Sequence, residues 1–444
     1  MKRTLYRKLL HWKNTTHRKP LLLQGARQVG KTYLINEFGN NEYQHYVYLN
    51  FEQNSDVKSL FAGNLDPYAI MSDISLYVGK KITSADTLIF LDEIQIVPEA
   101  ITSLKYFCEQ APEFHVVAAG SLLGVSVGKQ SSFPVGKVNF LTLYPMTFQE
   151  YLTAFDEELL SEKLSSLQGV HSLPECVHEK LLSHYKKYLY LGGMPEVLQD
   201  YSDNQDISSV RTIQHELLEA YQRDFSKYTE KTQAIKTYEL WRSVPYQLAK
   251  ENKKFKYGDV RKRARAVTYE QTIAWLQKAG LIHLAYHISV PKLPLSAYTD
   301  YSKFKIYVHD TGLLGAMLTL SSDMIIQPTR LFAEYNGAFI ENFVANELTA
   351  HGHTELFYWT SKSDAEVDFV FQKNNDIFPL EVKSGTSRNL KSLRSYAEKF
   401  QPKRIFRTSP RNFIKDKEFI NIPLYATFLM ADDNWFTTNG EPEH

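Results

Sequence analysis

The chain of 444 residues has little of several features that would fix its class at once. It contains only two cysteines, Cys108 and Cys176, which excludes a disulfide scaffold and a zinc site made of four cysteines. Such low cysteine content suits a reducing cytoplasm, which is the location we expect. Lysine and arginine number 51 against 50 aspartates and glutamates, so the formal net charge of +1 excludes a polycation. Any contact with nucleic acid must therefore come from a local basic patch.

Long apolar runs are also missing. No run approaches the ~20 residues that a bilayer span needs, so we expect no membrane partner. The basic N-terminal segment MKRTLYRKLLHWKN lacks the apolar core of a signal peptide, and we interpret it as a short amphipathic helix with Leu5, Leu9, Leu10 and Trp12 on one side. The chain is too long for one core, and its hydrophobic content of 43% is ordinary for a globular protein.

The most specific motif lies in PLLLQGARQVGKTYLINEF, residues 20–38. Three leucines predict a buried strand, a match to G-x-x-x-x-G-K-[ST] follows, and a helix-like stretch comes next. In such a loop, backbone N–H groups and the helix N-terminus hold phosphates, Lys31 reaches the outer phosphates, and the Thr32 hydroxyl binds Mg²⁺. The predicted cofactors are ATP and Mg²⁺. The predicted nucleotide-binding residues are Gly25, Ala26, Arg27, Gln28, Val29, Gly30, Lys31, Thr32 and Tyr33.

A second motif, DTLIFLDEIQ, places two acids after a continuous apolar run. Such a run predicts a central parallel strand, whose carboxyl end would lie beside the phosphate-binding loop. We expect Asp92 to hold Mg²⁺ through water and Glu93 to polarise the attacking water. A third strand, FHVVAAG, is followed by Ser121, which we interpret as a sensor of the terminal phosphate; the alternative is an ordinary turn residue.

These segments together resemble a family of prokaryotic AAA+ ATPases. LTLYPMTFQEYL, YLYLGGMPEVL (residues 188–198) and KFKIYVHDTGLLGAML (residues 303–318) extend the resemblance along nearly the whole chain. It implies a P-loop AAA+ parallel sheet over residues 1–150, which include the N-terminal helix, and a helical lid over residues 151–235. It also implies ATP hydrolysis in a homo-oligomer, of which a hexameric ring is one form.

One departure from this family concerns the arginine finger. The family often has Gly-Arg before the PMTF-like strand, whereas this chain has Gly136-Lys137. A trans-acting arginine raises hydrolysis about a thousandfold or more, and lysine lacks its planar fork. Lys137 is therefore a candidate for a weaker finger, and the alternative is an exposed lysine. Arg223 is a second candidate for reaching the nucleotide, from the lid or from a neighbouring subunit, and the alternative is an ordinary arginine on a helix surface.

The segment over residues 236–325 predicts a winged helix. Thr268 and Gln271 form a capping-box pattern, and the helix that follows is expected to stop at Gly280 before an apolar strand. Ahead of that helix, residues 253–265 hold seven basic residues and one acid, Asp259. Such a cluster suits phosphate contacts with DNA, and a solvated face is the alternative.

The C-terminal segment DAEVDFVFQKNNDIFPLEVKSG predicts a hairpin that carries Asp368, Glu381 and Lys383 on one side. Two neighbouring carboxylates repel each other unless a cation lies between them or one of them takes a proton. We expect Asp368 and Glu381 to bind Mg²⁺ and Lys383 to orient a water. Glu341, on an upstream helix, would complete the set. The pattern resembles the PD-(D/E)XK nuclease core of archaeal Holliday-junction resolvases and restriction enzymes, which implies a restriction-endonuclease-like α/β domain over residues 326–444.

Alternatives for this segment stay open. The hairpin could be an exposed element with a Glu–Lys pair worth only ~0–1 kcal/mol, and a nuclease fold can lose its activity and still bind nucleic acid. His351 and His353 lack further ligands at useful spacing, so we interpret them as loop residues.

The sequence leaves three functions to weigh. The first is an ATP-driven motor acting on DNA, with branched DNA as one candidate, whose C-terminal domain binds or cleaves it in a Mg²⁺-dependent reaction. The second is a nucleotide-switched signalling or defence ATPase with an inactive recognition domain, which a slow finger at Lys137 would suit. The third is a protein-remodelling ATPase. The basic cluster and the C-terminal acids favour the first.

Overall fold

The computed structural model of the chain forms two compact units. One comprises Met1–Tyr144 with Lys278–Leu281, and the other comprises Pro145–Gln277 with Ile282–His444. The residues that the structure describes are 1–84, 86–120, 134–229, 231–250, 254–323, 333–361, 365–373, 375–386, 389–433 and 435–436. Within these ranges no helix is both long and apolar enough to cross a membrane.

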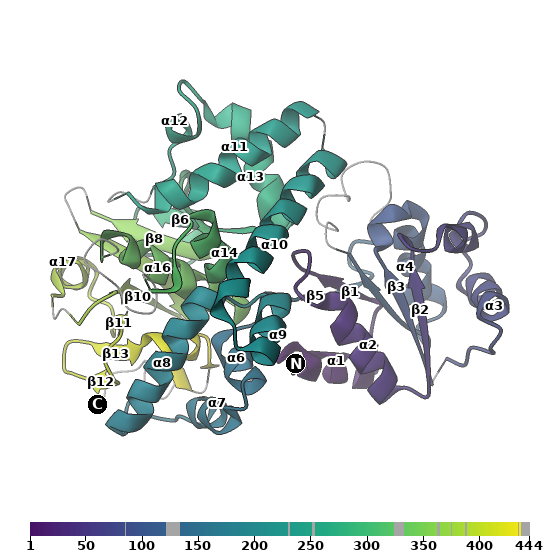
Figure 1. Cartoon of the computed structure of the whole chain (residues 1–444), viewed down its shortest axis with the longest axis horizontal. Coiled ribbons are helices and arrows are strands. Elements are labelled where there is room, and N and C mark those ends of the chain that lie inside the picture. The colour runs from purple at the N-terminus through teal and green to yellow at the C-terminus, as the bar shows by residue number, and fades with distance from the viewer. Residues whose placement is uncertain are drawn as a thin grey trace. The chain divides into compact units, whose positions relative to one another are not determined.

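A five-stranded parallel sheet forms the centre of the first unit (Figure 1). Its strands lie in the order β2-β3-β4-β1-β5, and all neighbours run parallel. They are β1 (Leu21–Gln24), β2 (His45–Asn50), β3 (Thr87–Asp92), β4 (His115–Ala119) and β5 (Asn139–Thr142). Because β3 and β4 are buried along their whole length, they carry the continuous apolar runs expected of central parallel strands. The predicted parallel sheet is confirmed.

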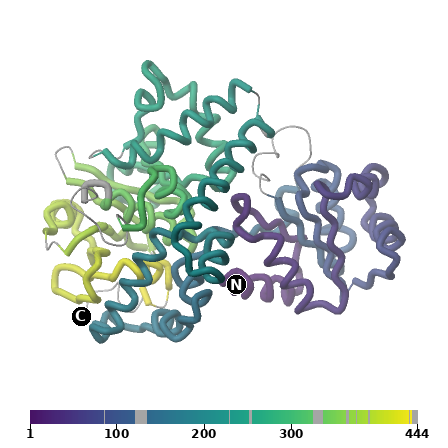
Figure 2. Tube along the Cα trace, in the orientation of Figure 1, coloured from purple at the N-terminus to yellow at the C-terminus, as the bar shows by residue number. Residues whose placement is uncertain are grey.

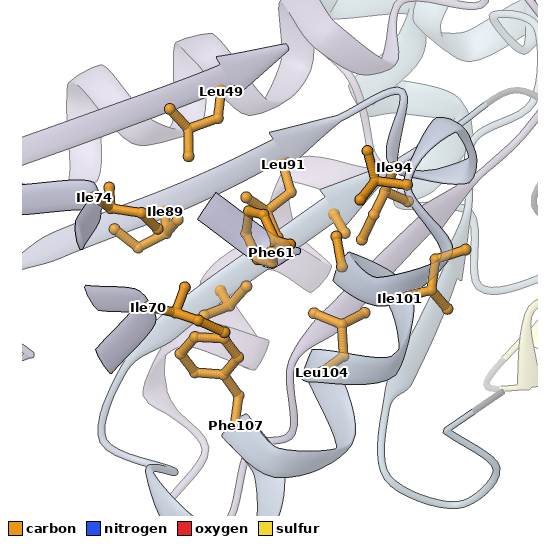
Figure 3. Close-up of a cluster of buried hydrophobic side chains, with 14 of the residues drawn as sticks. Leu49, Phe61, Ile70, Ile74, Ile89, Leu91, Ile94, Ile101, Leu104 and Phe107 are labelled. Carbon is orange, nitrogen blue, oxygen red and sulfur yellow. The ribbon is translucent and has the colours of Figure 1, made fainter. Parts of the chain in front are cut away.

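Helices cover this sheet and complete its core. They are α1 (Leu5–Asn14), α2 (Lys31–Glu42), α3 (Pro67–Val78) and α4 (Pro98–Gln110), with short 3-10 helices η1 (Ser55–Phe61) and η2 (Ile94–Ile96). Figure 3 shows Leu49 and Leu91 of the strands in one buried cluster with Ile70 of α3 and Leu104 of α4. Full burial of such a side chain stabilises the fold by about 1.5–3 kcal/mol.

The N-terminal helix α1 is amphipathic, as predicted. Leu5, Leu9 and Trp12 are buried, while Leu10 is only half-buried. Just before the helix, the buried guanidinium of Arg3 donates hydrogen bonds to the carbonyl of Val29 at 2.8 Å and to a second backbone carbonyl at 2.6 Å. The start of the chain therefore helps to hold the loop that follows β1.

Helices form the first part of the second unit. They are α6 (Phe148–Ala154), α7 (Glu158–Ser165), α8 (Glu175–Leu191), α9 (Pro195–Asn204), α10 (Ile207–Tyr228), α11 (Lys231–Leu248), α12 (Tyr257–Val260) and α13 (Ala266–Lys278). Local signals explain two of the starts. A capping box between Thr147 and Glu150 begins α6, and Pro195 occupies the first turn of α9, as expected for the GGMPEVL segment.

The start of α13 differs from the prediction. This helix begins at Ala266, so Thr268 lies inside its first turn and is not the cap. The reason is a backbone turn before it, in which Ala264 N–H donates to the carbonyl of Arg261 and Thr268 N–H to that of Arg265. The predicted stop at Gly280 is supported by its left-handed backbone, with φ of +74°. The winged helix over this segment stays a prediction.

An eight-stranded mixed sheet forms the rest of the second unit, in the order β12-β13-β11-β10-β9-β8-β6-β7 (Figure 1). Its strands are β6 (Ile282–Ile288), β7 (Thr299–Val308), β8 (Leu356–Thr360), β9 (Glu366–Lys373), β10 (Asp376–Val382), β11 (Phe406–Ser409), β12 (Ile414–Lys415) and β13 (Ile420–Pro423). The helical elements of this region are η3 (Leu295–Tyr298), α14 (Thr311–Met317), α16 (Ala333–Ala350), α17 (Lys391–Phe400) and η5 (Leu424–Met430). Figure 2 traces this part of the chain from green into yellow.

Two pairings in this sheet position the C-terminal candidate residues. β9 and β10 form an antiparallel hairpin, with Leu380 opposite Phe369, as the sequence predicts. β6 pairs with β7 in a second hairpin and runs parallel to β8. The sheet therefore continues across the boundary that we placed between residues 325 and 326, and β7 belongs to the same sheet as the predicted nuclease core.

Candidate functional site

The loop from Gly25 to Gly30 joins β1 to α2 and has the backbone of a phosphate-binding loop. Gly25 has φ of +145°, and Gly30, directly before α2, has φ of +93°. A Cβ at Gly25 would lie 2.2 Å from the carbonyl oxygen of Leu143, so only glycine fits there. Gln28 also has a positive φ, of +64°. The chain therefore curls ahead of a helix N-terminus, where backbone N–H groups and the helix dipole favour an anion.

The side chain of Lys31 points back into this loop. Its ammonium donates hydrogen bonds to the carbonyls of Gly25 at 3.0 Å and Ala26 at 2.8 Å. Burial lowers the pKa of Lys31 to about 8, although the nearby charges of Glu93 and Asp92 oppose that shift. The positive charge is thus held within the loop, within reach of any phosphate bound there.

The two acids after β3 lie beside the same helix. The carboxylate of Asp92 accepts hydrogen bonds from the Thr32 hydroxyl at 2.8 Å and from the Tyr48 hydroxyl at 3.1 Å. Glu93, with φ of +53°, donates its backbone N–H to the other Asp92 oxygen at 3.0 Å. Thr32 and Asp92 together offer two hard oxygen donors, which is the chemistry that Mg²⁺ prefers, so these residues fit the ion.

Glu93 itself is poised to act on water. Burial raises the pKa of its carboxyl group, and a hydrogen bond from Gln95, at 2.5 Å between Nε2 and Oε2, opposes the shift. A raised pKa brings a carboxylate closer to the strength that a general base needs near neutral pH. The structure therefore places a candidate base directly after a candidate metal ligand.

Sequence reasoning missed two members of this polar cluster. Tyr48 and Asn50 lie at the carboxyl end of β2, where Asn50 is in register with Asp92. The Asn50 amide donates to the Tyr48 hydroxyl at 2.9 Å, and its oxygen accepts two backbone N–H groups of the next turn. Both polar residues stand at the end of a strand-like run in the sequence. That position predicts a place in the site only if β2 is known to lie next to β3.

The other nucleotide-site candidates are placed as follows. Ala26 and Val29 are buried in the loop, Arg27 is half-buried, and Tyr33 is exposed. Ser121 lies outside the described residues.

The two finger candidates are both on the surface. Lys137 forms an ion pair with Glu109 at 3.0 Å. Arg223 lies on α10, 82% exposed, and pairs with Glu219 at 3.4 Å. Both pairs lie within one chain, so a role for either cation in the site of a second subunit stays a prediction.

The C-terminal candidates lie on neighbouring elements, but the three acids do not gather around one ion position. Glu341 is on α16, Asp368 on β9 and Glu381 on β10. In the described part of the chain, the one group of three or more His, Cys, Asp or Glu side chains with ligand atoms within 4.8 Å of one another is Glu175, His178 and Glu179. Glu341, Asp368 and Glu381 therefore form no such group of three in the described part of the chain, and a magnesium ion held by Asp368 and Glu381 alone stays a prediction.

Another cation stands among these acids. The ammonium of Lys305, on β7, lies 2.9 Å from Glu341 Oε1, 2.5 Å from Glu366 Oε1 and 3.9 Å from Asp368 Oδ1. The Tyr307 hydroxyl donates a further hydrogen bond to Glu341 at 2.5 Å. The sequence did not point to Lys305 or Glu366, because β7 precedes the hairpin by some sixty residues and the contact between them is non-local.

Glu381 and Lys383 form a separate pair. Lys383 Nζ lies 2.7 Å from Glu381 Oε1, as the alternative of a Glu–Lys pair predicts, but Glu381 is buried and not on an exposed face. Burial raises the pKa of Glu381, and Lys383 opposes this shift. Asp368 accepts the backbone N–H of Val382 at 2.8 Å, which ties the two strands of the hairpin together. His351 and His353 both contact backbone carbonyls, as expected of loop residues.

The basic cluster ahead of α13 is accessible. Its described members with exposed side chains are Lys256, Arg261, Lys262, Arg263 and Arg265. Two acids lie close to it: Asp259 pairs with Lys250 at 2.7 Å, and Glu239 lies 4.0 Å from Arg261. Most of the positive charge therefore faces solvent, where it is available to a polyanion.

Comparison with protein families identifies part of the chain. Residues 17–152 match a family model described as an AAA domain. Residues 17–152 therefore form an AAA domain. Residues 182–324 and 336–426 match two further models, each described as a domain of unknown function, DUF8612 and DUF4143. A search of curated proteins finds no match.

Solved structures give weaker similarities. The Walker-type ATPase PABY2304 of Pyrococcus abyssi is 13% identical with a TM-score of 0.44, covering 70% of this chain and 94% of that one. The Aeropyrum pernix ORC1 protein in complex with DNA is 12% identical with a TM-score of 0.30, covering 71% and 90%. AMPPCP-bound DnaA from Aquifex aeolicus is 14% identical with a TM-score of 0.26, covering 62% and 86%. Similarities of this size do not assign a function to the chain.

Proposed function

We propose that this protein is an ATP-hydrolysing AAA+ motor that acts on DNA. The observation that carries the proposal is the hydrogen bond between Thr32 and Asp92, with Glu93 next in the chain. It brings together the two oxygen donors that suit Mg²⁺ and the acid that suits water activation, at the start of the helix that follows the phosphate-binding loop.

Each residue then has a defined task. Backbone N–H groups of the loop from Gly25 to Tyr33 bind the phosphates, and Lys31 neutralises the outer ones. Thr32 and Asp92 hold Mg²⁺, which supplies charge stabilisation at the phosphates when bound. Glu93 orients and polarises the attacking water, and Ser121 senses the terminal phosphate. Lys137 or Arg223 completes the site from a second subunit of a homo-oligomer. We propose a hexameric ring as the form of this oligomer.

Steady-state measurement of phosphate release tests the proposed ATP hydrolysis and the role of Glu93 in it. Glu93→Gln keeps the shape of the side chain but removes the base, so turnover should fall about 10²–10⁴-fold while nucleotide binding persists. Glu99→Gln is a matched control, because Glu99 is an exposed acid in the first turn of α4. Turnover that is equal in the two variants would contradict the assignment of Glu93.

DNA is proposed as the partner because of the exposed basic residues between Lys256 and Arg265. Phosphate contacts from lysine and arginine supply most of the affinity of non-specific DNA binding. The cytoplasm is the proposed location. The C-terminal nuclease-like domain is a second DNA contact in this proposal, and branched DNA is the substrate to test first against duplex and single strands.

A signalling or defence ATPase with an inactive recognition domain is the second candidate. The observation that favours it is the pairing of Lys137 with Glu109, since a lysine already held in an ion pair makes a poor finger and slow hydrolysis suits a switch. The two candidates differ in one measurable property. A motor hydrolyses ATP faster in the presence of DNA, whereas a switch of this kind hydrolyses it at the same slow rate with or without DNA.

A further inference from the structure

Lys305 is held in a cage of carboxylates. Its ammonium has three N–H donors, and it meets Glu341 at 2.9 Å, Glu366 at 2.5 Å and Asp368 at 3.9 Å. The side chains of Lys305 and Glu341 are each only 1% exposed. A lysine buried this deeply is stable in its charged form only if acids surround it.

The protonation state of Lys305 follows from these neighbours. Burial alone lowers the pKa of Lys305, but the charges of Glu341, Glu366 and Asp368 outweigh burial and raise the pKa well above its ordinary value. The ammonium is therefore a permanent positive charge over the physiological pH range.

The position of Lys305 is fixed from two sides. The side-chain amide of Asn342, next to Glu341 on α16, both donates to and accepts from the backbone of Val308 on β7, each at 2.8 Å. The ring of Tyr358 on β8 lies 5.0 Å from the ammonium, in cation–π range. Because β7 and α16 are tied together in this way, the ammonium has little room to leave the acids.

The remaining acid of the predicted nuclease set has its own counter-charges. Glu381 pairs with Lys383 at 2.7 Å, and it is in register with Arg407 on β11, whose positive charge acts on it. The set thus contains four carboxylates and three protein cations, counting Lys305, Lys383 and Arg407. The three cations offset all but one of the four negative charges without a divalent ion.

We propose that Lys305 takes the place of the divalent cation in this PD-(D/E)XK-like core, so that the C-terminal domain binds DNA without cutting it. A metal ion that joined Glu341 to Asp368 would meet the ammonium, which lies 2.9 Å from Glu341 and 3.9 Å from Asp368, and the two positive charges would repel each other at such short range. The proposal replaces the expectation of a shared Mg²⁺. It rests on the nuclease-like fold proposed above and is independent of whether the AAA domain hydrolyses ATP.

A second position for a metal ion in this core is at Oε2 of Glu381, and variants of Glu381 and Asp368 test it. Oε2 of Glu381 is buried and accepts no hydrogen bond within the described part of the chain. A metal bound there would be lost on Glu381→Gln and on Asp368→Asn. If Lys305 is the resident cation, the full chain has no metal site for these variants to remove.

The experiment measures Mn²⁺ binding to the full chain by electron paramagnetic resonance, in an Asp92→Asn/Glu175→Gln/Glu179→Gln background that removes the nucleotide-site metal and the two exposed acids of the group with His178. We expect no bound Mn²⁺ when Lys305 is present, and one equivalent in Lys305→Ala, which is lost again on adding Glu341→Gln. Lys303→Ala, on the same strand and in a half-buried pair with Asp300 at 2.6 Å, should bind none.

The outcome is decisive even if Lys305→Ala does not fold. One equivalent of Mn²⁺ bound in the presence of Lys305 and lost on Asp368→Asn or Glu381→Gln would overturn the proposal. So would Mg²⁺- or Mn²⁺-dependent cleavage of duplex, single-stranded or four-way DNA by the native protein that Asp368→Asn abolishes. A folded Lys305→Ala variant without Mn²⁺ would also contradict it, because the vacated carboxylates should then take the ion.

Discussion

The hydroxyl of Thr32 and the carboxylate of Asp92 lie 2.8 Å apart, although 60 positions separate them in the chain. The contact exists because parallel strands β1 and β3 end at the same edge of one sheet, on either side of β4. Substituting Thr32→Val keeps the shape of the side chain but removes one metal ligand and the hydrogen bond. We expect Mg²⁺-dependent ATP binding to weaken about tenfold or more, while Mg²⁺-free nucleotide binding changes little.

Gly25 provides a steric test of the phosphate-binding loop. In Gly25→Ala the new Cβ would meet the Leu143 carbonyl at 2.2 Å, at a φ of +145° that alanine rarely adopts. We expect loss of nucleotide binding together with a lower melting temperature. Gly63→Ala is the matched control, because a Cβ there meets no atom within 4 Å, and equal effects in the two variants would contradict the account.

The lowered pKa of Lys31 predicts proton uptake when ATP binds. In the nucleotide-free loop burial lowers this pKa to about 8, and phosphates favour the charged form, so ATP binding near pH 8 should take up a fraction of a proton. Calorimetry in buffers of different ionisation enthalpy measures the uptake. Lys31→Arg keeps the charge but does not titrate, and it should show none.

The same shift has a defined sign for stability. The folded-state pKa of Lys31 lies below its unfolded value of about 10.4, so the unfolded chain binds more protons between about pH 8 and pH 10.4. The contribution of Lys31 to the stability of the nucleotide-free protein therefore increases as pH rises through that window. Chemical denaturation of the native protein and of Lys31→Arg at both ends of the window would reveal the difference.

The raised pKa of Glu93 predicts how the rate of ATP hydrolysis falls on the acid side of its pH profile. Because Glu93 acts as a base in our proposal, the rate falls as pH drops through its pKa, which burial places above the ordinary value of about 4.3. We expect Gln95→Leu, which removes a hydrogen bond that opposes the shift, to move this limb to still higher pH. A limb that stays in place would exclude Glu93 as the titrating group.

Removing Lys305 should be costly for folding. Lys305→Met leaves Glu341 buried beside two other acids, and breaking such a pair typically costs about 3–5 kcal/mol. Adding Glu341→Gln should restore part of that loss, so the two changes will not be additive. Lys303→Met should cost no more than about 1 kcal/mol, since its pair with Asp300 is far more accessible to solvent than the pair of Lys305 with Glu341. Urea denaturation of all four proteins gives the comparison.

Local sequence signals predicted the elements that meet around Thr32 and Asp92. The loop, the strand before it and the acids after β3 each follow from a short segment, and the sheet brings them together by the general rule for parallel strands. The antiparallel hairpin of β9 and β10 was equally local, because turn residues separate two strand-like runs. Tyr48 was missed since it acts only through the neighbouring strand β3.

The C-terminal site shows what local reasoning could not supply. Lys305 reaches Glu341 and Asp368 because β6 pairs with β8, a contact between segments about 70 residues apart. Nothing in KFKIYVHDTGLLGAML marks Lys305 as buried, and lysine is rarely buried without acids around it. A charge balance over the predicted acids would have required a further cation, but the sequence does not say whether that cation is a metal or a lysine.

The coupling of ATP hydrolysis to DNA is the central claim, and one measurement tests it most directly. Phosphate release is followed with and without four-way, duplex and single-stranded DNA, in the native protein and in Lys256→Glu/Lys262→Glu/Arg265→Glu. Lys186→Glu/Lys187→Glu, with two exposed lysines on α8, is the control. We predict that DNA accelerates hydrolysis, that salt weakens this effect, and that only the triple variant loses it. A hydrolysis rate that is the same with and without every DNA would contradict the account.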